Sequence, residues 1–351
     1  MIAGLAMIAG LKVLNPGLCT TVQDLGRAGY QALGVPVSGA LDAIALRLGN
    51  ALVGNPAAAA ALEILVSGSR LEVAADTVRV AVAGAGACLE LDDGGRVVPG
   101  WESVTLACGD VFTVRLGRQS ACAYLAVEGG IAVPLVLGSA ATCLRAAFGG
   151  FEGRSLRRGD VVPLASGRAI ERDEQRLPSP PPSGSDQRIR AVLGPQQDCF
   201  TAEALALLLD AEFRISKDID RMGMRLDGPP LRHRAGWDIV SDAIATGAIQ
   251  VPGSGQPIVL LADHQTTGGY PKIATVISAD LPVVGRRGPG DMIAFTAVSV
   301  EDAEEFARAA ERELIALIAS FEAVQTHRNG SLDLGSLYGD NLISGVVTAV
   351  E

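Results

Sequence analysis

Lysine is the residue type that this 351-residue sequence most clearly lacks, since only three of its 29 basic residues are lysines: Lys12, Lys217 and Lys272. A lysine inside a motif is therefore informative. Aromatic residues make up only 4% of the chain, and the formal net charge is −10. Because phosphate backbones are bound by clustered Lys and Arg, this charge balance argues against a nucleic-acid surface.

The sequence also lacks the motifs of several common sites. Its six cysteines include no C-x-x-C pair and its three histidines are widely spaced, so we expect no metal site and cysteines that act as small hydrophobes. No P-loop motif is present, and none of the lysines has the Met-Lys-Met setting of a biotin attachment site. The GAGA run at 84–87 lacks the third glycine of a dinucleotide fingerprint.

Long hydrophobic runs are absent too. The opening MIAGLAMIAGL is apolar, but it has no basic flank and is too short to span a bilayer. Its internal repeat makes Met7 an alternative translation start to Met1. We expect a cytoplasmic, reduced protein that makes no membrane contact.

Glycine, by contrast, is abundant, with 42 residues spread among short apolar runs. This pattern predicts a mainly β fold in two strand-rich segments, 11–167 and 188–298. Between them, the Pro/Ser-rich stretch 168–187 is typical of an extended, solvated linker. Residues 326–351 carry mixed signals and could form a strand or an oligomer contact.

A few helices are expected. One begins near Ser38 and stops before Pro56, and a second follows Thr201 as its N-cap. The strongest is a C-terminal helix over 299–325, with Ser299 and Asp302 in a capping-box arrangement. We expect its apolar stripe to pack on the second strand-rich segment.

A weak internal repeat is visible in the dipeptide Gly-Asp followed by apolar residues. It occurs at Gly109-Asp110, Gly159-Asp160 and Gly290-Asp291. Two related β domains would explain it, and so would the fact that Gly-Asp is a common hairpin turn.

The first polar, glycine-dense stretch is 20–42, which carries Asp24 and Arg27 directly before a helix. Backbone amides at a helix N-terminus suit anions or carbonyl oxygens. Alternatively, this is a structural loop in which Asp24 and Arg27 cap their own turns.

The second stretch, 257–281, places a long polar insert between two apolar strands. A plain hairpin needs only two to five loop residues, so we interpret the insert as functional. The amide of Gln265 can donate to and accept from a substrate amide, and Lys272 supplies a compact cation. The remaining candidate residues of this insert are Thr266, Thr267, Gly268 and Tyr270. His264 alone is not assigned as a base.

A third stretch, 218–231, contains Asp220, Arg221 and Arg225. It predicts either an Asp–Arg pair that fixes a turn or an anion clamp in which Arg221 faces the second loop.

These residues resemble the biotin-dependent carboxyltransferase-like family, also called allophanate hydrolase subunit 2 or the KipA family, which includes the C component of prokaryotic 5-oxoprolinase. The matching motifs are TTVQDLGRAGY, GVPVSGALD, LGNALVGNP, AYLAVEGGI, LGSAAT, DRMGMRLDGP and GAIQVPGSGQPIVLLADHQTTGGYPKIATVISADLP, in order over residues 12–298. Two positions depart from the family pattern: His264 stands where Arg or a small residue is usual, and Asp242 where Glu is commoner.

The resemblance implies two tandem cyclophilin-like β-barrels and a subunit that is inactive alone. Its partners would be a KipI-like subunit 1 and a LamB/YcsF-type subunit, in a complex that uses ATP to hydrolyse 5-oxo-L-proline to L-glutamate. Alternatives are the carboxyltransferase component of a urea-type carboxylase and a non-enzymatic regulator that binds a KipI-type kinase inhibitor. In each enzymatic case the substrate is a small cyclic amide or urea-like molecule.

The same resemblance assigns roles to the candidate residues. Gln265 would form hydrogen bonds with the adjacent C=O and N–H of the substrate, and Lys272 would stabilise a carboxylate or phosphorylated intermediate. Substrate contacts would come from Thr266, Thr267, Gly268, Tyr270, Asp24, Arg27 and Arg221. The chain itself carries no biotin attachment site, and ATP need not bind to it.

Overall fold

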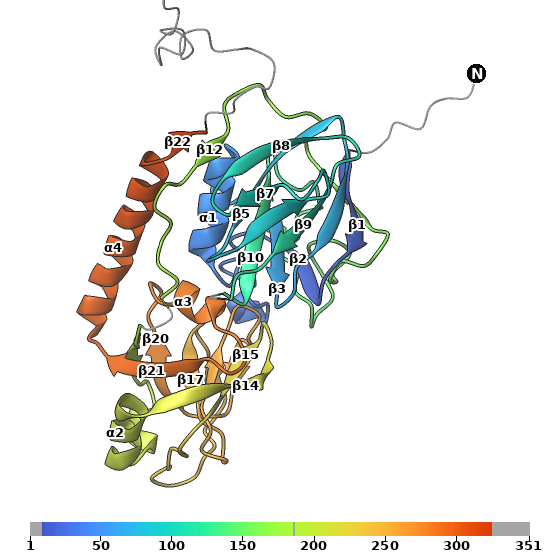
Figure 1. Cartoon of the computed structure of the whole chain (residues 1–351). Helices are drawn as coiled ribbons and strands as arrows, with labels where there is room; N and C mark the ends of the chain where they lie inside the picture. Colours follow the sequence, from blue (N-terminus) through green and yellow to red (C-terminus); the bar gives the residue numbers. More distant parts are fainter. Residues whose placement is uncertain (1–8, 119, 185–186, 325–351) are drawn as a thin grey trace, which may run out of the picture.

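Figure 1 shows the computed structural model, which describes residues 9–118, 120–184 and 187–324. Two β-rich units lie one above the other, and a long C-terminal helix runs beside both. None of the helices in these ranges is long and apolar enough to cross a membrane.

The first unit consists of two sheets that share one core. One sheet has the order β11-β1-β4-β9-β6-β7 and the other β2-β3-β10-β5-β8. Their bounds are β1 Gly10–Asn15, β2 Cys19–Gln23, β3 Ala61–Leu65, β4 Arg70–Ala74, β5 Thr77–Ala83, β6 Cys88–Leu91, β7 Val97–Pro99, β8 Ser103–Ala107, β9 Val111–Arg115, β10 Cys122–Val127 and β11 Val161–Pro163. Residues such as Leu11, Leu62 and Phe112 meet between the sheets.

The second unit is a closed barrel with the order β13-β20-β17-β18-β15-β14-β21. Its strands are β13 Ile189–Leu193, β14 Glu212–Ile219, β15 Gly223–Asp227, β17 Ala248–Gln250, β18 Ile258–Leu260, β20 Lys272–Val276 and β21 Met292–Ala297. The mainly β prediction is confirmed, and the second segment closes into a barrel as expected. In the first unit, the hydrogen bonds join the strands into two facing sheets.

The helix α1, Ala43–Leu52, covers the outer face of β5 and β10, which is why both strands are buried almost throughout. The predicted start at Ser38 is wrong, because Ser38 has a left-handed φ of 56° that a helix cannot contain. Asp42 is the N-cap and accepts a hydrogen bond of 2.9 Å from the backbone N–H of Ala45.

Two shorter helices belong to the barrel unit. The helix α2, Ala202–Asp210, is capped by Thr201 as predicted. The helix α3, Leu281–Arg286, was not predicted, because at six residues it is too short to show a helical apolar period. Two 3₁₀ turns are also present, η1 at Gln31–Leu33 and η2 at Gln197–Cys199.

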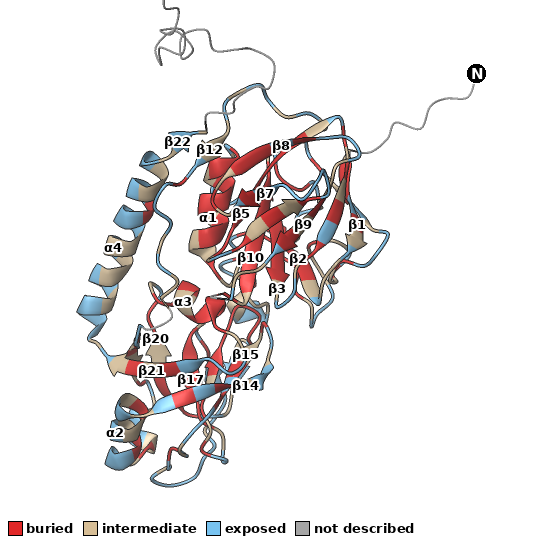
Figure 2. Ribbon diagram, viewed as in Figure 1, coloured by how far each residue is buried: buried red, intermediate tan, exposed pale blue. Residues whose placement is uncertain are grey.

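The C-terminal helix α4, Val300–Ala319, begins with the predicted cap, in which Ser299 Oγ accepts from the N–H of Asp302 at 3.0 Å. The expectation that it packs on the barrel is right only in part, since Arg190 of β13 lies 4.0 Å from the centre of the Phe306 ring but most of the apolar stripe packs elsewhere. Its apolar residues Leu314, Leu317 and Phe321 join the cluster around α1 of the first unit. Figure 2 shows α4 as mostly exposed, which fits a helix that rests on one narrow stripe.

Beyond α4 the chain forms β22, Glu322–Ala323, which pairs with β12, Gln175–Arg176. The helix therefore ends at Ala319, short of the expected 325. The tail 326–351 and the alternative start at Met7 lie outside the described residues.

The three Gly-Asp dipeptides form the same turn three times. In each, the Asp carboxylate accepts a hydrogen bond from the backbone N–H three residues earlier, at 2.7 Å for Asp110, 2.7 Å for Asp160 and 2.8 Å for Asp291. Each preceding glycine has a positive φ between 87° and 95°, and each turn leads into a strand. The same turn thus occurs in both units, and two related β domains or the frequency of Gly-Asp turns would each account for it.

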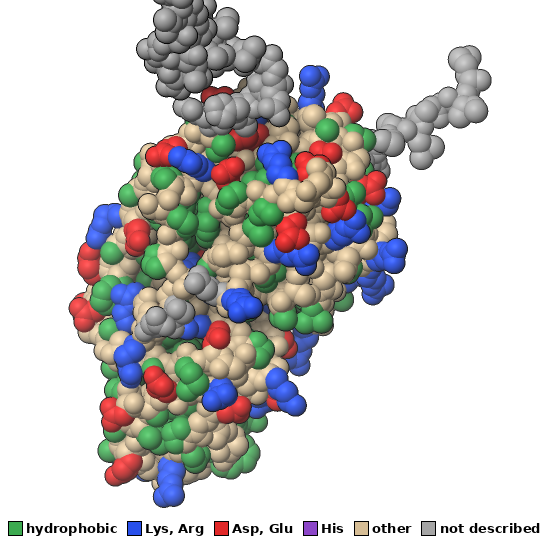
Figure 3. Space-filling model, in the orientation of Figure 1, with side chains coloured by type: hydrophobic (Ala, Val, Ile, Leu, Met, Phe, Trp, Pro, Cys, Tyr) green, Lys and Arg blue, Asp and Glu red, His purple; other side chains and the backbone are tan. Residues whose placement is uncertain are grey.

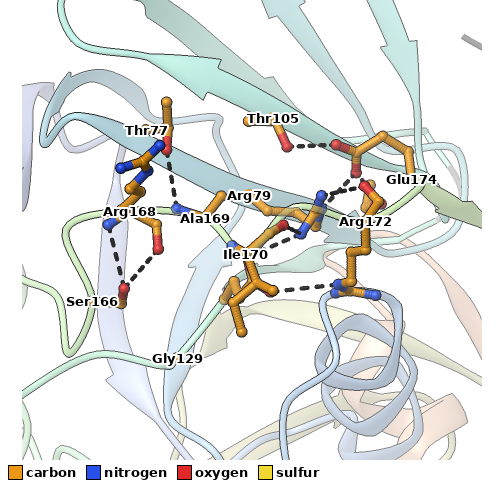
Figure 4. Close-up of polar contacts among 12 residues, drawn as sticks. Thr77, Arg79, Thr105, Gly129, Ser166, Arg168, Ala169, Ile170, Arg172 and Glu174 are labelled. Carbon is orange, nitrogen blue, oxygen red and sulfur yellow. Dashed lines mark hydrogen bonds and ion pairs between the residues drawn. The ribbon is translucent and has the colours of Figure 1, made fainter.

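The linker prediction needs an addition: no residue of 168–176 is buried, as expected for a solvated linker, but this part is also anchored on the first unit. Figure 4 shows the anchor, Arg79, whose side chain is 3% exposed. Its guanidinium donates to Ile170 O at 2.9 Å and to Arg172 O at 2.8 Å, and it pairs with Glu174 at 3.0 Å. A buried arginine can only be stable with such partners, so Arg79 and this strap stabilise each other.

Candidate active-site cleft

The barrel unit carries a cleft of about 460 Å³ beside the β14–β15 hairpin. Its lining combines apolar side chains such as Met222 and Leu260 with polar ones, namely Lys217, Asp218, Asp220, Arg225, Gln250, Gln265 and Tyr270. Two of the predicted site residues, Gln265 and Tyr270, thus line one cavity, together with two cations that come from the hairpin.

Two glutamine amides meet on the cleft wall. Gln265 Nε2 donates to Gln250 Oε1 at 3.3 Å, and Gln250 Nε2 donates to Tyr270 O at 3.2 Å. Gly268 makes this possible, because a Cβ at that position would lie 2.8 Å from Gln250 Nε2. The amides are thereby oriented before any ligand binds, which suits recognition of another amide.

A two-stranded flap lies next to these glutamines. It consists of β16, Asp242–Ala243, paired with β19, Thr267–Gly268, and it includes Thr266, whose carbonyl accepts from the N–H of Ile244. The candidates Thr266, Thr267 and Gly268 therefore belong to the flap.

Lys272 lies under the flap at the start of β20, and its side chain is 3% exposed. The ammonium donates to Asp242 Oδ2 at 2.8 Å and to Ala243 O at 3.0 Å. It is a neighbour of Gln250 across the β17–β20 ladder, but it does not line the cleft itself. Its predicted role in catalysis stays a prediction.

His264 is fully buried beside this site and its hydrogen bonds define its tautomer. Nδ1 lies 2.6 Å from Gln265 O, which can only accept, so Nδ1 carries the proton and Nε2 accepts from Thr246 Oγ1 at 3.0 Å. Burial lowers the pKa of His264 below its usual 6.5 and outweighs the opposing effects of the Gln265 carbonyl and of Asp263. The imidazole therefore orients the loop in its neutral form.

This shift predicts a pH-dependent stability. Because the unfolded chain protonates His264 more readily, the free energy of unfolding should fall as the pH drops below about 6.5. Urea unfolding at about pH 8 and about pH 5.5 measures the loss, and His264→Gln should reduce it. An equal loss in the variant would contradict the assignment.

Tyr270, which lines the cleft, forms an aromatic pair with Trp237. Trp237 and Tyr270 have ring centroids 6.1 Å apart, and both side chains are substantially exposed, at 51% and 40%. The indole packs flat on Gly253, where a Cβ would lie 2.9 Å from the ring. Exposed aromatic surface of this kind is available to cover a planar ligand.

Asp24 and Arg27, the candidates of the first loop, lie apart from the cleft. Asp24 accepts from Gly26 N at 2.7 Å, from Ser139 Oγ at 2.7 Å and from Ala140 N at 2.6 Å. The Arg27 guanidinium is buried, lies 4.8 Å from the Phe148 ring and donates to the carbonyl of Ala141. Both side chains tie together loops of the first unit, which favours the structural interpretation of this loop.

Arg221 lies at the contact between the two units. It forms a bidentate pair with Asp263, at 2.9 and 3.1 Å, and a further ion pair with Glu63 of β3. All three side chains are at most 3% exposed. Burial alone would lower the pKa of Arg221, but the carboxylates of Glu63 and Asp263 raise it. The anions that Arg221 binds in the structure are therefore the chain's own carboxylates, which favours the structural interpretation of this arginine.

A second arginine repeats this arrangement nearby. Arg286 of α3 pairs with Asp42, the N-cap of α1, at 2.5 Å. Tyr124 of β10 links the two clusters, since its hydroxyl accepts from Asp42 N at 2.8 Å and donates to Glu63 at 2.6 Å. Burial and the charge of Glu63 raise the pKa of Tyr124, so the phenol stays protonated.

Sequence reasoning did not assign Gln250, Trp237, Gln196 or Asp242 to the site. Gln250 is a lone polar residue in the apolar run AIQV, and that was the only available signal. The others come from segments that are distant in sequence and meet only in the folded barrel.

Within the described ranges, no group of three or more His, Cys, Asp and Glu side chains could hold a metal ion. On the face shown in Figure 3, Lys and Arg side chains are interspersed with Asp and Glu. The described residues of that face form no single basic patch.

Proteins of known family share both the sequence and the fold of this chain. The chain matches the family profile described as carboxyltransferase domain, subdomain A and B, over residues 33–297. It is 39% identical over 293 residues to the C component of 5-oxoprolinase from Escherichia coli, covering 84% of this chain and 93% of that protein. It is 32% identical to urea amidolyase of Saccharomyces cerevisiae, covering 83% of this chain but only 17% of that protein.

Among solved structures, the Kluyveromyces lactis urea carboxylase superposes with a TM-score of 0.79 at 29% identity, covering 90% of this chain and 30% of that one. A mainly β chain with a closed barrel and an amide-lined cleft therefore has relatives in two groups of enzymes. The chain belongs to the carboxyltransferase domain family, subdomains A and B.

Proposed function

We propose that this chain is the C-type component of an ATP-dependent 5-oxoprolinase complex that hydrolyses 5-oxo-L-proline to L-glutamate. The observation that carries the proposal is the cleft, where the oriented amides of Gln250 and Gln265 face the same cavity as Lys217 and Arg225. A cyclic amide with a carboxylate presents the complementary groups, an adjacent C=O and N–H and one negative charge.

The extent of the sequence match supports the same choice. The chain spans 93% of the E. coli 5-oxoprolinase component, whereas it spans 17% of the yeast urea amidolyase. Urea has no carboxylate that could pair with Lys217 or Arg225, the two cations of a cleft that also carries Asp218 and Asp220. The other components would be a KipI-like subunit and a LamB/YcsF-type subunit, and ATP need not bind to this chain.

The test is a coupled assay of the full complex. The chain is combined with its two partner subunits, ATP and 5-oxo-L-proline, and glutamate release is followed. Absence of glutamate from the assembled complex would refute the proposal. Carboxybiotin-dependent turnover of urea would instead support the carboxyltransferase alternative, and binding of a kinase inhibitor without any turnover would support a regulatory role.

Binding can be followed separately on this chain, because it has two tryptophans. Trp101 is buried in the first unit, whereas Trp237 is 51% exposed and its ring lies 6.1 Å from that of Tyr270 in the cleft lining. We expect 5-oxo-L-proline to change the emission of Trp237 in a saturable manner, and Trp237→Phe to abolish the change. A signal that persists in Trp237→Phe would place the ligand elsewhere.

A further inference from the structure

Lys272 is held by a small polar cluster, Asp242 and Gln196, that lies outside the lining of the cleft. Asp242 Oδ2 accepts from Lys272 Nζ at 2.8 Å and from Gln196 Nε2 at 3.1 Å. Gln196 also forms two hydrogen bonds with the backbone of Lys272. Its side-chain Oε1 accepts from Lys272 N at 3.1 Å, and its backbone N–H donates to Lys272 O at 3.1 Å. One glutamine therefore fixes both the strand that carries the lysine and the carboxylate that faces it.

The ammonium of Lys272 and the carboxylate of Asp242 differ strongly in their exposure to solvent. The Lys272 side chain is 3% exposed and the Asp242 side chain 50% exposed. A buried ammonium needs compensation for its lost hydration, whereas a half-exposed carboxylate keeps much of its own. The pair therefore fixes the lysine more than it stabilises the aspartate.

The hydrogen-bond count at the ammonium, taken over the described residues, leaves one donor open. A lysine ammonium has three N–H groups, and the contacts with Asp242 Oδ2 and Ala243 O account for two of them. The third N–H has no partner among the described residues, so it is the donor that remains for an oxygen of a substrate or intermediate. Because the ammonium is already held in place by its two other hydrogen bonds, little side-chain entropy is lost when this N–H binds an oxygen on which negative charge develops.

From this geometry we propose that Asp242 and Gln196 are positioning residues for Lys272, which hold its ammonium under the β16–β19 flap with one N–H directed to an anionic or carbonyl oxygen of the substrate. The proposal deepens the function proposed above and depends on it for the identity of the substrate. Lys272 also holds the pKa of Asp242 below its usual value, so the contact persists through neutral pH.

A first experiment does not require turnover. Because the chain has three lysines, reductive methylation with ¹³C-formaldehyde gives few, separable NMR signals. We expect the amine of Lys272 to react at least about tenfold more slowly than those of Lys12 and Lys217, and Asp242→Asn to speed up its labelling alone. Labelling of Lys272 at the rate of Lys12 in the wild type would overturn the proposal.

The second experiment measures glutamate release by the full complex. Asp242→Asn should lower kcat by about tenfold or more with little change in KM, Gln196→Ala should lower it less, and Asp242→Glu should recover most of the activity. The exposed Asp238 of the same loop provides the control, and Asp238→Asn should behave as wild type. If the wild-type complex is active and Asp242→Asn is unimpaired, the positioning role is refuted. If the wild-type complex itself is inactive, the proposed function is refuted, and the labelling experiment alone decides whether Asp242 holds Lys272.

Discussion

Replacing Arg221 by methionine is expected to lower the free energy of unfolding by about 3–5 kcal/mol. The guanidinium compensates two buried carboxylates, Glu63 from the first unit and Asp263 from the second. Methionine fills a similar volume but leaves both charges without their cation. The loss is therefore set by uncompensated buried charge rather than by lost packing.

Urea unfolding followed by circular dichroism measures this loss. The matched control is Arg225→Met, at an exposed position of β15, which should change stability little. The double variant Glu63→Gln/Arg221→Met should be less destabilised than the sum of its single variants, because the charge that Arg221 neutralises is then missing. Additive losses would contradict a direct interaction.

Replacing Lys272 by methionine is expected to reduce turnover of the complex by about 10²–10³-fold, the usual effect of removing one preset donor to a developing negative charge. The chain should remain folded, because its partner Asp242 is half exposed and stays hydrated without the lysine. Glutamate release and the urea midpoint, measured on the same preparations, separate the two effects.

The control for this substitution is Lys12→Met. Lys12 pairs with Glu72 on the surface of the first unit, at 2.9 Å, far along the chain from the cleft. It should leave turnover unchanged. Near-normal turnover in Lys272→Met would remove Lys272 from the catalytic machinery and would leave the cleft residues as the remaining candidates.

The sequence was sufficient to locate the cleft-forming loop, because Gln265 and Tyr270 stand in a polar insert between apolar strands, and such an insert is visible without a structure. It was also sufficient for the helix caps at Thr201 and Ser299, which depend on neighbouring residues only. Local patterns predict local structure well.

The remaining features depend on contacts between distant parts of the chain. Arg221 meets Glu63 across 158 positions, and Lys272 meets Asp242 across 30, so no spacing rule could pair them. The same holds for Arg79, whose hydrogen bonds anchor the expected linker on the first unit. The α4 stripe was recognised correctly, but an apolar stripe does not specify which surface it covers.

The anchored strap and α4 together restrict how this molecule can move. Both segments that run between the units are fastened to the first unit, one by Arg79 and the other by packing on α1, and Arg221 and Arg286 join the units between them. A hinge rotation would have to break several buried ion pairs at once, because Arg221 and Arg286 each pair with a carboxylate of the first unit. We therefore expect the two units to move as one body, with the geometry of the cleft set by the barrel unit alone.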